Sequence, residues 1–213
     1  MEIAKFIDHT LLKPEARPAD IEKLCKEAIS NRFAAVCVNP VYVPLAASLL
    51  GGSGVEVATV VGFPLGANTM RTKVQETEEA LVNGATEIDM VMAIGLYKAG
   101  SFSEVRKDIE MVVHAAAGRP VKVIIESCLL NEKEIEEASI ISADAGASYV
   151  KTSTGFSTGG ATVEAVAAMK RAVGNRCKIK ASGGIKTRDA ALLMIDAGAS
   201  RIGTSSGVAI VNP

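Results

Sequence analysis

Short runs rich in β-branched residues recur along the chain, separated by longer amphipathic stretches. We interpret eight of these runs as strands, at residues 5–10, 34–39, 55–62, 87–92, 121–127, 148–153, 178–182 and 201–205. Over 213 residues the spacing is about 27 residues per unit, enough for one strand, one helix and two short loops. The pattern therefore predicts a repeated β-then-α order.

The joints between the predicted elements carry signals of their own. The phrase DAGAS occurs at residues 144–148 and again at 196–200, and NGATE at 83–87 is a looser copy, each directly before a strand. Glycine in each copy stands where a helix would end in a left-handed residue, a conformation that glycine adopts without steric cost. Further helices are predicted over residues 18–30 and from a Thr187 cap to Ala197.

Repeated β-then-α order implies a parallel sheet, which either stays open and doubly wound or closes into a barrel. Eight regular units favour closure, and the segment IDHTLLKPEARP lacks the glycine-rich dinucleotide loop of the open alternative. The sequence therefore predicts an α/β fold, a single (β/α)₈ TIM barrel over residues 1–213. Only GVAIVNP follows the eighth strand, so we expect the final helix to be short or missing.

Composition narrows the class of protein. Hydrophobic residues make up 48% of the chain and charged residues 22%, with a net charge of -1, which indicates an ordered globular protein without the basic field of a nucleic-acid binder. No leader-like start and no membrane-spanning apolar run is present, so we expect a soluble cytoplasmic protein. The four cysteines form no C-x-x-C pair and are expected to be reduced. Short barrels often associate, so a homo-oligomer is compatible with the sequence, although no interface is readable in it.

Charged residues are predicted inside the barrel. Because alternate strand residues point to opposite faces, the apolar parity of each strand identifies the residues that face inward. These residues are Asp8 and Thr10, Asp89, Glu126, Tyr149 and Lys151, and Lys178 and Lys180. Several lie near the C-terminal ends of their strands, where barrel enzymes place their chemistry. The alternative is a structural network in which carboxylates neutralise the lysines, and a parity error of one residue would turn every side chain over.

Two of these lysines belong to consecutive strands. Lys151 and Lys180 are 29 residues apart, so their strands are expected to be neighbours about 4.8 Å apart. At about 5 Å and an effective dielectric near 20, two ammonium groups repel by roughly 3 kcal/mol, or about two pKa units. One lysine would then be partly neutral, and a neutral amine attacks carbonyls to form an iminium. Asp89 with Asp8 could move the protons that this chemistry requires.

Metal-assisted chemistry has less support in the sequence. A carbonyl-polarising metal ion is usually held by histidines, and the chain has only His9 and His114. His9 has outward parity and His114 lies in a predicted helix, so both are expected to be packing or surface residues. We therefore predict neither a metal nor another cofactor.

Three polar, glycine-containing segments follow consecutive strands. They are TSTG at residues 152–155, SGGI at 182–185 and GTSSG at 203–207. Barrel enzymes often bind phosphate in the loops after strands seven and eight, where backbone N–H groups approach the oxyanion. The three segments together predict an anion site, although each alone is typical of an ordinary turn.

Four motifs resemble those of the deoxyribose-phosphate aldolase family. They are IDHTLLKP at residues 7–14, EIDMVMAIG at 87–95, YVKTSTGF at 149–156 and KASGGI at 180–185, and the resemblance covers essentially the whole chain. Members of this family are class I aldolases that join acetaldehyde and glyceraldehyde 3-phosphate reversibly into 2-deoxyribose 5-phosphate. The resemblance implies a small phosphorylated sugar as substrate and a lysine Schiff base as intermediate.

The resemblance also implies roles for individual residues. Lys151 would form the Schiff base, Lys180 would perturb it and Asp89 would relay protons. The residues implied at the substrate are Asp8, Thr10 and Cys37, and those implied at the phosphate are Gly155, Gly183, Gly184, Ser205 and Ser206. Some members have lysine where this chain has Phe156, so we expect neutral donors to carry phosphate recognition.

Two alternatives stay open at this point. Another Schiff-base barrel, such as a transaldolase or a keto-acid aldolase, could share a lysine on strand six. A catalytically silent barrel that binds phosphometabolites would bind ligand without forming a covalent adduct.

Overall fold

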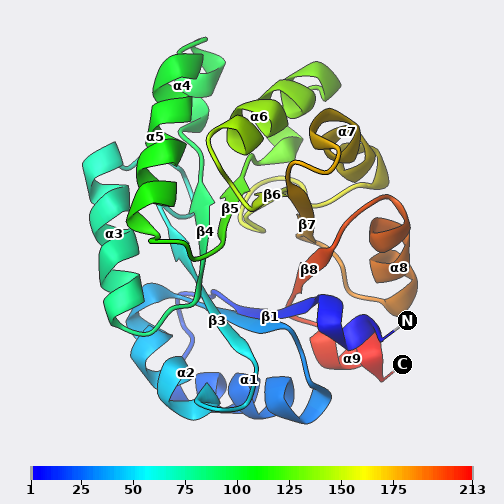
Figure 1. The fold of residues 1–213 in the computed structure, drawn as a ribbon. Helices are drawn as coiled ribbons and strands as arrows, with labels where there is room; N and C mark the ends of the chain where they lie inside the picture. Colours follow the sequence, from blue (N-terminus) through cyan, green and yellow to red (C-terminus); the bar gives the residue numbers. More distant parts are fainter. Residues whose placement is uncertain (1, 213) are drawn as a thin grey trace.

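The strands of the protein close into a parallel barrel. The computed structural model describes residues 2–212, and Figure 1 shows the strands as an inner ring with helices outside it. Neighbouring strands pair in sequence order from β1 to β8, and β8 pairs with β1. The strands are β1 (Ile7–Leu11), β2 (Ala35–Val38), β3 (Glu56–Val61), β4 (Glu87–Val91), β5 (Val121–Ile124), β6 (Tyr149–Lys151), β7 (Lys178–Ser182) and β8 (Arg201–Thr204). The predicted (β/α)₈ fold is confirmed.

All eight predicted strands are present, and only the seventh has the predicted bounds; the other seven differ at one or both ends. The first was predicted from residue 5, but the 3₁₀ helix η1 (Ile3–Phe6) precedes β1. The fifth and sixth end earlier than predicted, at Ile124 and Lys151. Beyond β5 the chain turns, because Glu126 has a φ of +53° and the 3₁₀ helix η3 (Ser127–Leu129) follows.

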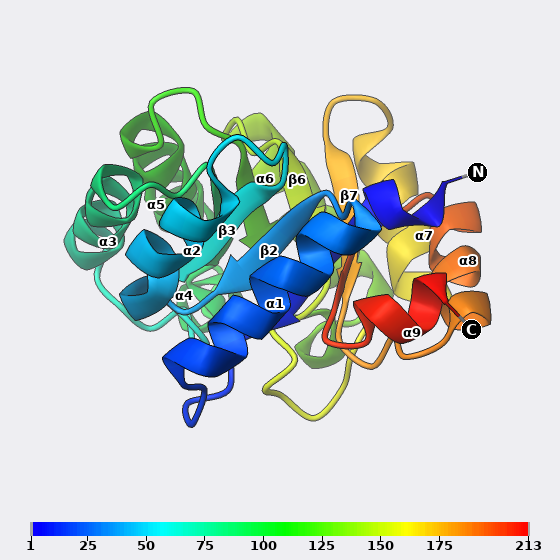
Figure 2. The same cartoon turned by 90° about the horizontal axis from the view of Figure 1, so that it is seen from below.

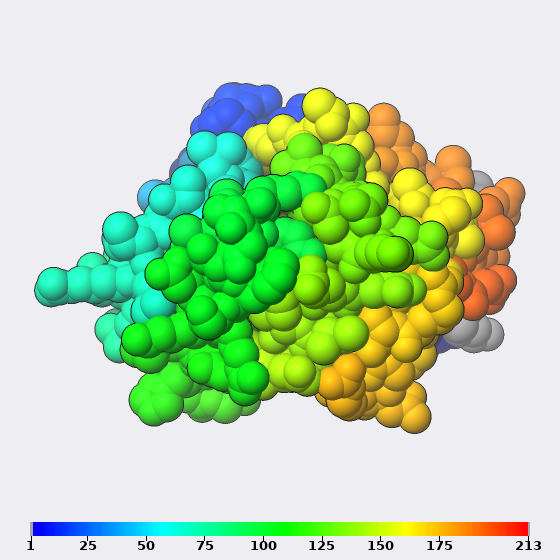
Figure 3. All heavy atoms as spheres, turned by 90° about the horizontal axis from the view of Figure 1, so that it is seen from above, coloured from blue at the N-terminus to red at the C-terminus, as the bar shows by residue number. Residues whose placement is uncertain are grey.

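Helices cover the outside of the barrel. They are α1 (Pro18–Asn31), α2 (Val43–Leu50), α3 (Met70–Val82), α4 (Ile94–Lys98), α5 (Phe102–Ala115), α6 (Glu132–Asp144), α7 (Val163–Val173), α8 (Arg188–Asp196) and α9 (Gly207–Val211), with the 3₁₀ helix η2 (Pro40–Tyr42) before α2. The last helix is short, as predicted, and packs against η1, so the two ends of the described chain lie side by side (Figure 2). Figure 3 shows one outer face, on which α5 and α6 lie between α3 and α7. Within residues 2–212, the apolar helices all fall short of the length that a bilayer crossing requires.

The predicted helix-to-strand joints are confirmed. Gly84, Gly146 and Gly198 have φ angles of +102°, +89° and +116°, the left-handed region that the repeated phrases predict. Thr187 caps α8, and its Oγ1 accepts a hydrogen bond from the Ala190 N–H at 3.2 Å. These joints end each helix where the chain must turn back into the barrel.

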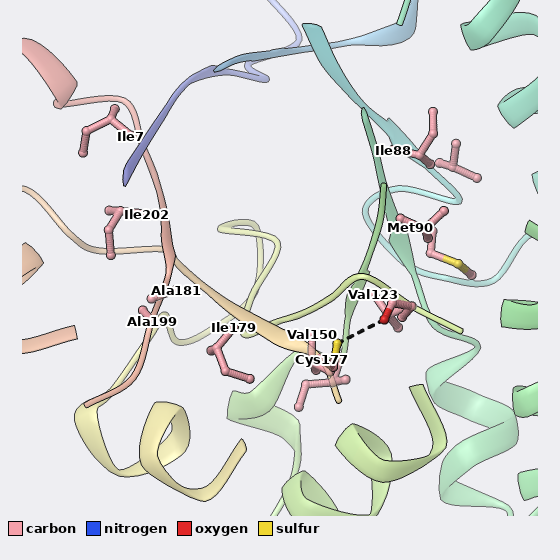
Figure 4. Packing of buried hydrophobic residues seen from close by; sticks show 14 of the residues in the cluster. Ile7, Ile88, Met90, Val123, Val150, Cys177, Ile179, Ala181, Ala199 and Ile202 are labelled. Atoms are coloured by element: carbon pink, nitrogen blue, oxygen red, sulfur yellow. Dashed lines mark hydrogen bonds between the residues drawn. The ribbon is translucent and has the colours of Figure 1, made fainter. Parts of the chain in front are cut away.

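The main core lies between the barrel and the helices. Figure 4 shows outward-pointing, buried side chains from successive strands, among them Ile7, Met90, Val123, Val150 and Ile179. A smaller inner cluster, formed by Leu12, Cys37, Ala58 and Val60, lies inside the barrel. The strands are therefore apolar on the outward parity, as predicted, whereas charged side chains such as Asp89, Lys122 and Lys180 share the inward parity with this smaller cluster.

Candidate active site

The barrel interior brings the predicted lysines and aspartates into direct contact. Lys151 Nζ donates to Asp89 Oδ2 at 2.8 Å, and Lys180 Nζ donates to the same oxygen at 2.7 Å. Lys180 also donates to Asp8 Oδ2 at 2.5 Å. All four side chains are at most 3% exposed. The carboxylate of Asp89 therefore bridges the two lysines on neighbouring strands.

A second group of charges lies next to this one, and the sequence interpretation missed it. Lys122 Nζ is 2.7 Å from Asp89 Oδ1 and 2.7 Å from Glu87 Oε2. Arg201 reaches Asp8 Oδ1 at 2.6 Å and Glu87 Oε1 at 3.0 Å. The alternation rule could have found Lys122, because Val121 and Val123 on either side of it point outward.

The amine of Lys151 is easier to deprotonate than an ordinary lysine. Burial is the largest cause of its lowered pKa, and the neighbouring Lys180 ammonium lowers it further, while the Asp89 carboxylate opposes both. Repulsion by Lys180, the cause expected from the sequence, is therefore the smaller of the two effects that lower the pKa of Lys151, because removal from water contributes more. The sequence left open a structural ion-pair network and a reactive lysine, and features of both are present. Carboxylates pair the lysines, and yet one lysine still has a lowered pKa.

The partners of Lys151 are held in their charged forms. Against the effect of burial, the Asp8 and Asp89 carboxylates raise the pKa of Lys180 above its ordinary value. Against the same effect, Lys122, Lys151 and Lys180 hold the pKa of Asp89 well below its ordinary value. The pKa of Asp8 falls to about 2 despite burial, through Lys180 and Arg201. Lys180 therefore stays protonated at neutral pH, and Asp89 is a weak base.

A cavity of about 320 Å³ opens beside Lys151 at the C-terminal ends of the strands. Its wall contains the predicted residues Lys151, Thr10, Gly155, Gly183, Gly184 and Ser205. The wall also contains two lysines that the sequence interpretation did not consider, Lys13 and Lys186. Ser206, predicted at the phosphate, is not part of the wall, and its backbone N–H donates to Thr204 Oγ1 at 2.9 Å.

The loops after β6 and β7 are joined by a backbone hydrogen bond and pack closely against each other. The Ala161 N–H donates to the Gly183 carbonyl at 3.0 Å. A Cβ on Gly160 would lie 2.2 Å from that carbonyl oxygen, so only glycine fits there. Gly183 itself has a φ of +89°. The two loops that line the cavity therefore form one unit.

Cys37, His9 and His114 lie in three different surroundings. Cys37 is fully buried in the inner cluster, and burial raises the pKa of its thiol to about 11, so it stays protonated at neutral pH. His9 points outward, with its Nε2 2.7 Å from Glu27 Oε2 and its ring edge against Phe33. His114 lies in the last turn of α5. The predicted outward position of His9 is confirmed.

Two residues that were predicted to face the barrel interior, Lys178 and Glu126, lie elsewhere. Lys178 is exposed, because β7 begins at this residue and its side chain leaves the barrel at the N-terminal end, 5.5 Å from the Tyr149 ring. Glu126 is buried but lies beyond β5, where it accepts hydrogen bonds from the Thr154 N–H and hydroxyl at 3.2 and 2.5 Å. It holds the loop after β6 and makes no contact with the lysines in the hydrogen-bond network.

The profile of the DeoC/LacD family aldolases matches residues 3–212 of the chain. The chain belongs to this aldolase family. Relatives in the family include the deoxyribose-phosphate aldolase of Brevibacillus brevis, 56% identical over 99% of this chain and 96% of its own length. The deoxyribose-phosphate aldolase of a Geobacillus species is 58% identical, with 98% of this chain and 94% of its own length covered.

Solved structures of the family have the same architecture. The deoxyribose phosphate aldolase of Aeropyrum pernix, described as having a unique tetrameric structure, superposes with a TM-score of 0.92 at 36% identity. The match covers 99% of this chain and 89% of that one. The aldolase QR15 superposes with a TM-score of 0.95 at 41% identity, covering 99% and 94%. Family membership therefore extends over the entire barrel, including every strand that contributes to the candidate site.

Proposed function

We propose that this aldolase cleaves 2-deoxyribose 5-phosphate reversibly to acetaldehyde and glyceraldehyde 3-phosphate, with Lys151 as the covalent nucleophile. The observation that carries the proposal is the position of Lys151, a buried amine with a lowered pKa that forms part of the wall of the cavity. Glycine-rich loops suited to an anion line the same cavity. Relatives that carry this enzyme name match over almost their full length.

The neutral amine of Lys151 attacks the aldehyde carbon of the open-chain sugar and forms a carbinolamine. Loss of water then gives an iminium, which withdraws electrons from the neighbouring carbon. Removal of the proton from the C3 hydroxyl breaks the bond between C2 and C3, and glyceraldehyde 3-phosphate leaves. The enamine that remains takes a proton at C2, and hydrolysis of the resulting iminium releases acetaldehyde.

Lys180 and Asp89 serve the proton transfers. Lys180 is charged and shares Asp89 Oδ2 with Lys151, so it lies within one hydrogen bond of the group that receives the carbinolamine proton. Asp89 is too weak a base to keep that proton, so it orients the two amines and returns the proton to the carbinolamine oxygen, which leaves as water. Thr10 lines the cavity, while Asp8 and Cys37 lie in the barrel interior next to it.

Phosphate binding combines neutral donors with two exposed cations. Gly183, Gly184 and Ser205 offer backbone and hydroxyl donors, and Lys13 and Lys186 line the same cavity. Purely neutral recognition was expected because Phe156 stands where some family members have lysine, but Lys13 and Lys186 come from other loops. The Phe156 ring instead packs edge-on against Phe63, with 5.3 Å between the ring centroids.

Ser205→Ala is expected to raise the KM for deoxyribose 5-phosphate by about ten- to a hundredfold, because a hydrogen bond to a charged group contributes roughly 1.5–3 kcal/mol. Ser206→Ala is the matched control and should have a smaller effect, since Ser206 does not line the cavity. The kcat/KM for unphosphorylated deoxyribose should barely change in either variant. Equal losses on both substrates would show that Ser205 supports folding or catalysis instead.

Activity is expected to survive exhaustive treatment with EDTA. Iminium formation withdraws electrons from the reacting carbon, which is the task of the metal ion in metal-dependent aldolases. The retro-aldol rate before and after treatment is the measurement, with a zinc-dependent aldolase treated alongside as the control. Loss of activity that zinc restores would contradict the proposed mechanism.

A retro-aldol assay tests the proposed substrate directly. Three compounds are compared at equal concentration: 2-deoxyribose 5-phosphate, fructose 6-phosphate and a phosphogluconate-type keto acid. We expect cleavage of the first with release of acetaldehyde. Preferential cleavage of either other compound would transfer the chain to another Schiff-base activity, and binding without turnover would indicate a catalytically silent barrel.

A further inference from the structure

The charged side chains inside the barrel form one continuous column. Its cations are Lys122, Lys151, Lys180 and Arg201, and its carboxylates are Asp8, Glu87 and Asp89. With every group ionised, the column holds one more cation than carboxylate. Removing an unbalanced charge from water is costly, so one cation of the column is favoured to lose its proton.

Lys151 is the cation with the fewest partners. Its Nζ contacts a single carboxylate, that of Asp89. Lys180 contacts Asp8 and Asp89, and Arg201 contacts Asp8 and Glu87. Lys122 contacts Glu87 and Asp89 closely and Asp8 at 3.9 Å. A neutral Lys151 leaves three cations facing three carboxylates.

Glu87, Lys122 and Arg201 lie near the N-terminal ends of their strands and form the lower part of the column. This lower part competes with Lys151 for the negative charge of the carboxylates. Lys122 binds Asp89 through Oδ1, whereas Lys151 and Lys180 share Oδ2. Arg201 binds Asp8 through Oδ1, whereas Lys180 uses Oδ2. Glu87 joins Lys122 to Arg201 and supplies the only carboxylate of this lower part. Each lower cation therefore weakens the hold of a carboxylate on the lysines above it.

The geometry points to Lys122, Arg201 and Glu87 as positioning residues that set how readily Lys151 becomes a neutral amine. This inference rests on the proposed role of Lys151 and goes beyond it, because none of the three residues lines the cavity. Lys122 and Arg201 favour the neutral amine by adding positive charge and by occupying carboxylate oxygens. Glu87 limits this effect.

The other titratable groups near Lys151 do not supply the charge that Lys122, Arg201 and Glu87 supply. Cys37 on β2 is a neutral thiol, since burial raises its pKa to about 11. The Tyr149 ring on β6 lies 6.0 Å from Lys122 Nζ and 5.7 Å from the Arg201 guanidinium carbon, and so packs against both lower cations. Lys178, at the N-terminal end of β7, is exposed to solvent and screened.

Opposite charges in the column predict opposite pH shifts. Lys122→Met removes a cation, raises the pKa of Lys151 and moves imine formation to higher pH. Glu87→Gln removes a carboxylate, lowers the pKa of Lys151 and moves imine formation to lower pH. Over the short distances of a buried network, each shift is on the order of one pH unit. At the wild-type midpoint, Lys122→Met should form about fivefold less imine.

The readout is the yield of the reduced acetaldehyde adduct on Lys151 after a fixed time with cyanoborohydride, measured by mass spectrometry from pH 5 to 9. The pH dependence of the reagent is common to all variants and cancels in their ratio. Lys122→Arg and Glu87→Asp keep the charges and should keep the wild-type midpoint. Arg201→Met, whose side chain is 12% exposed, should shift the midpoint in the same direction as Lys122→Met, by less.

Each variant has its own predicted direction of midpoint shift. Every variant that circular dichroism shows to be folded therefore tests the inference separately. Opposite shifts for Glu87→Gln and Lys122→Met support the inference. Unchanged midpoints, or shifts in the same direction for both, overturn it, because a purely structural role would lower the yield at every pH. If the wild-type protein forms no adduct on Lys151 at any pH, the proposed nucleophile itself is wrong.

Discussion

Lys151→Leu is expected to lower the rate of 2-deoxyribose 5-phosphate cleavage by on the order of 10⁴-fold or more, because the covalent route has no substitute nucleophile at that position. In the wild-type protein, borohydride added with acetaldehyde or with the sugar phosphate should leave a stable adduct on Lys151. Peptide mapping locates the adduct, and the variant should show none there.

Lys180 is the control position for this result, since it shares Asp89 Oδ2 with Lys151 and is equally buried. Its charged state makes it a poor nucleophile at neutral pH. An adduct found mainly on Lys180, or turnover without any adduct, would show that the nucleophile is assigned to the wrong lysine.

Lys180→Leu is expected to move imine formation upward by about one to two pH units and to lower activity at pH 7 by roughly ten- to a hundredfold. The sign follows from the shared carboxylate. Without the Lys180 ammonium, the Oδ2 atom of Asp89 acts on Lys151 alone and stabilises its charged form, so the pKa of Lys151 rises. The fraction of neutral amine at a given pH below that pKa therefore falls. The pH profile of single-turnover imine formation is the measurement.

The matched control is Lys178→Leu, which removes an exposed lysine at the start of the same strand. This variant should keep both the wild-type rate and the wild-type pH profile. Lys180→Leu also leaves Asp8 and Asp89 each without one partner, so a lower free energy of unfolding is expected as well. An unchanged pH profile in a folded Lys180→Leu variant would refute the electrostatic role.

Strand parity predicted most of the fold and the upper part of the site. It placed Asp8, Asp89, Lys151 and Lys180 inside the barrel, because the outward residues of each strand are apolar and the alternation is regular. The same rule applied to β5 would have added Lys122. Parity failed for Lys178, since it says which face a residue points to and not whether the strand end covers it.

Other features lie beyond any rule of spacing. Glu126 was expected among the lysines, but the left-handed turn after β5 directs it to the loop after β6. The sharing of Asp89 oxygens among three lysines depends on distances of a few ångströms between strands far apart in sequence. The lowered pKa of Lys151 could therefore be predicted in direction but not in its main cause, because burial cannot be measured from the order of residues.

The column of charged side chains inside the barrel also has a consequence for how the chain folds. Lys180 on β7 and Asp8 on β1 are separated by 172 positions, and Arg201 on β8 and Asp8 by 193, so these pairs form only when the last two strands come together with the first. Contacts so distant in sequence are formed late and make folding slow. A nascent chain that ends before β8 has no Arg201, and Asp8 then lacks one of its two closest cations. The electrostatic environment of the reactive amine is therefore a product of ring closure, and it should arise in the same kinetic phase as the final strand pairing.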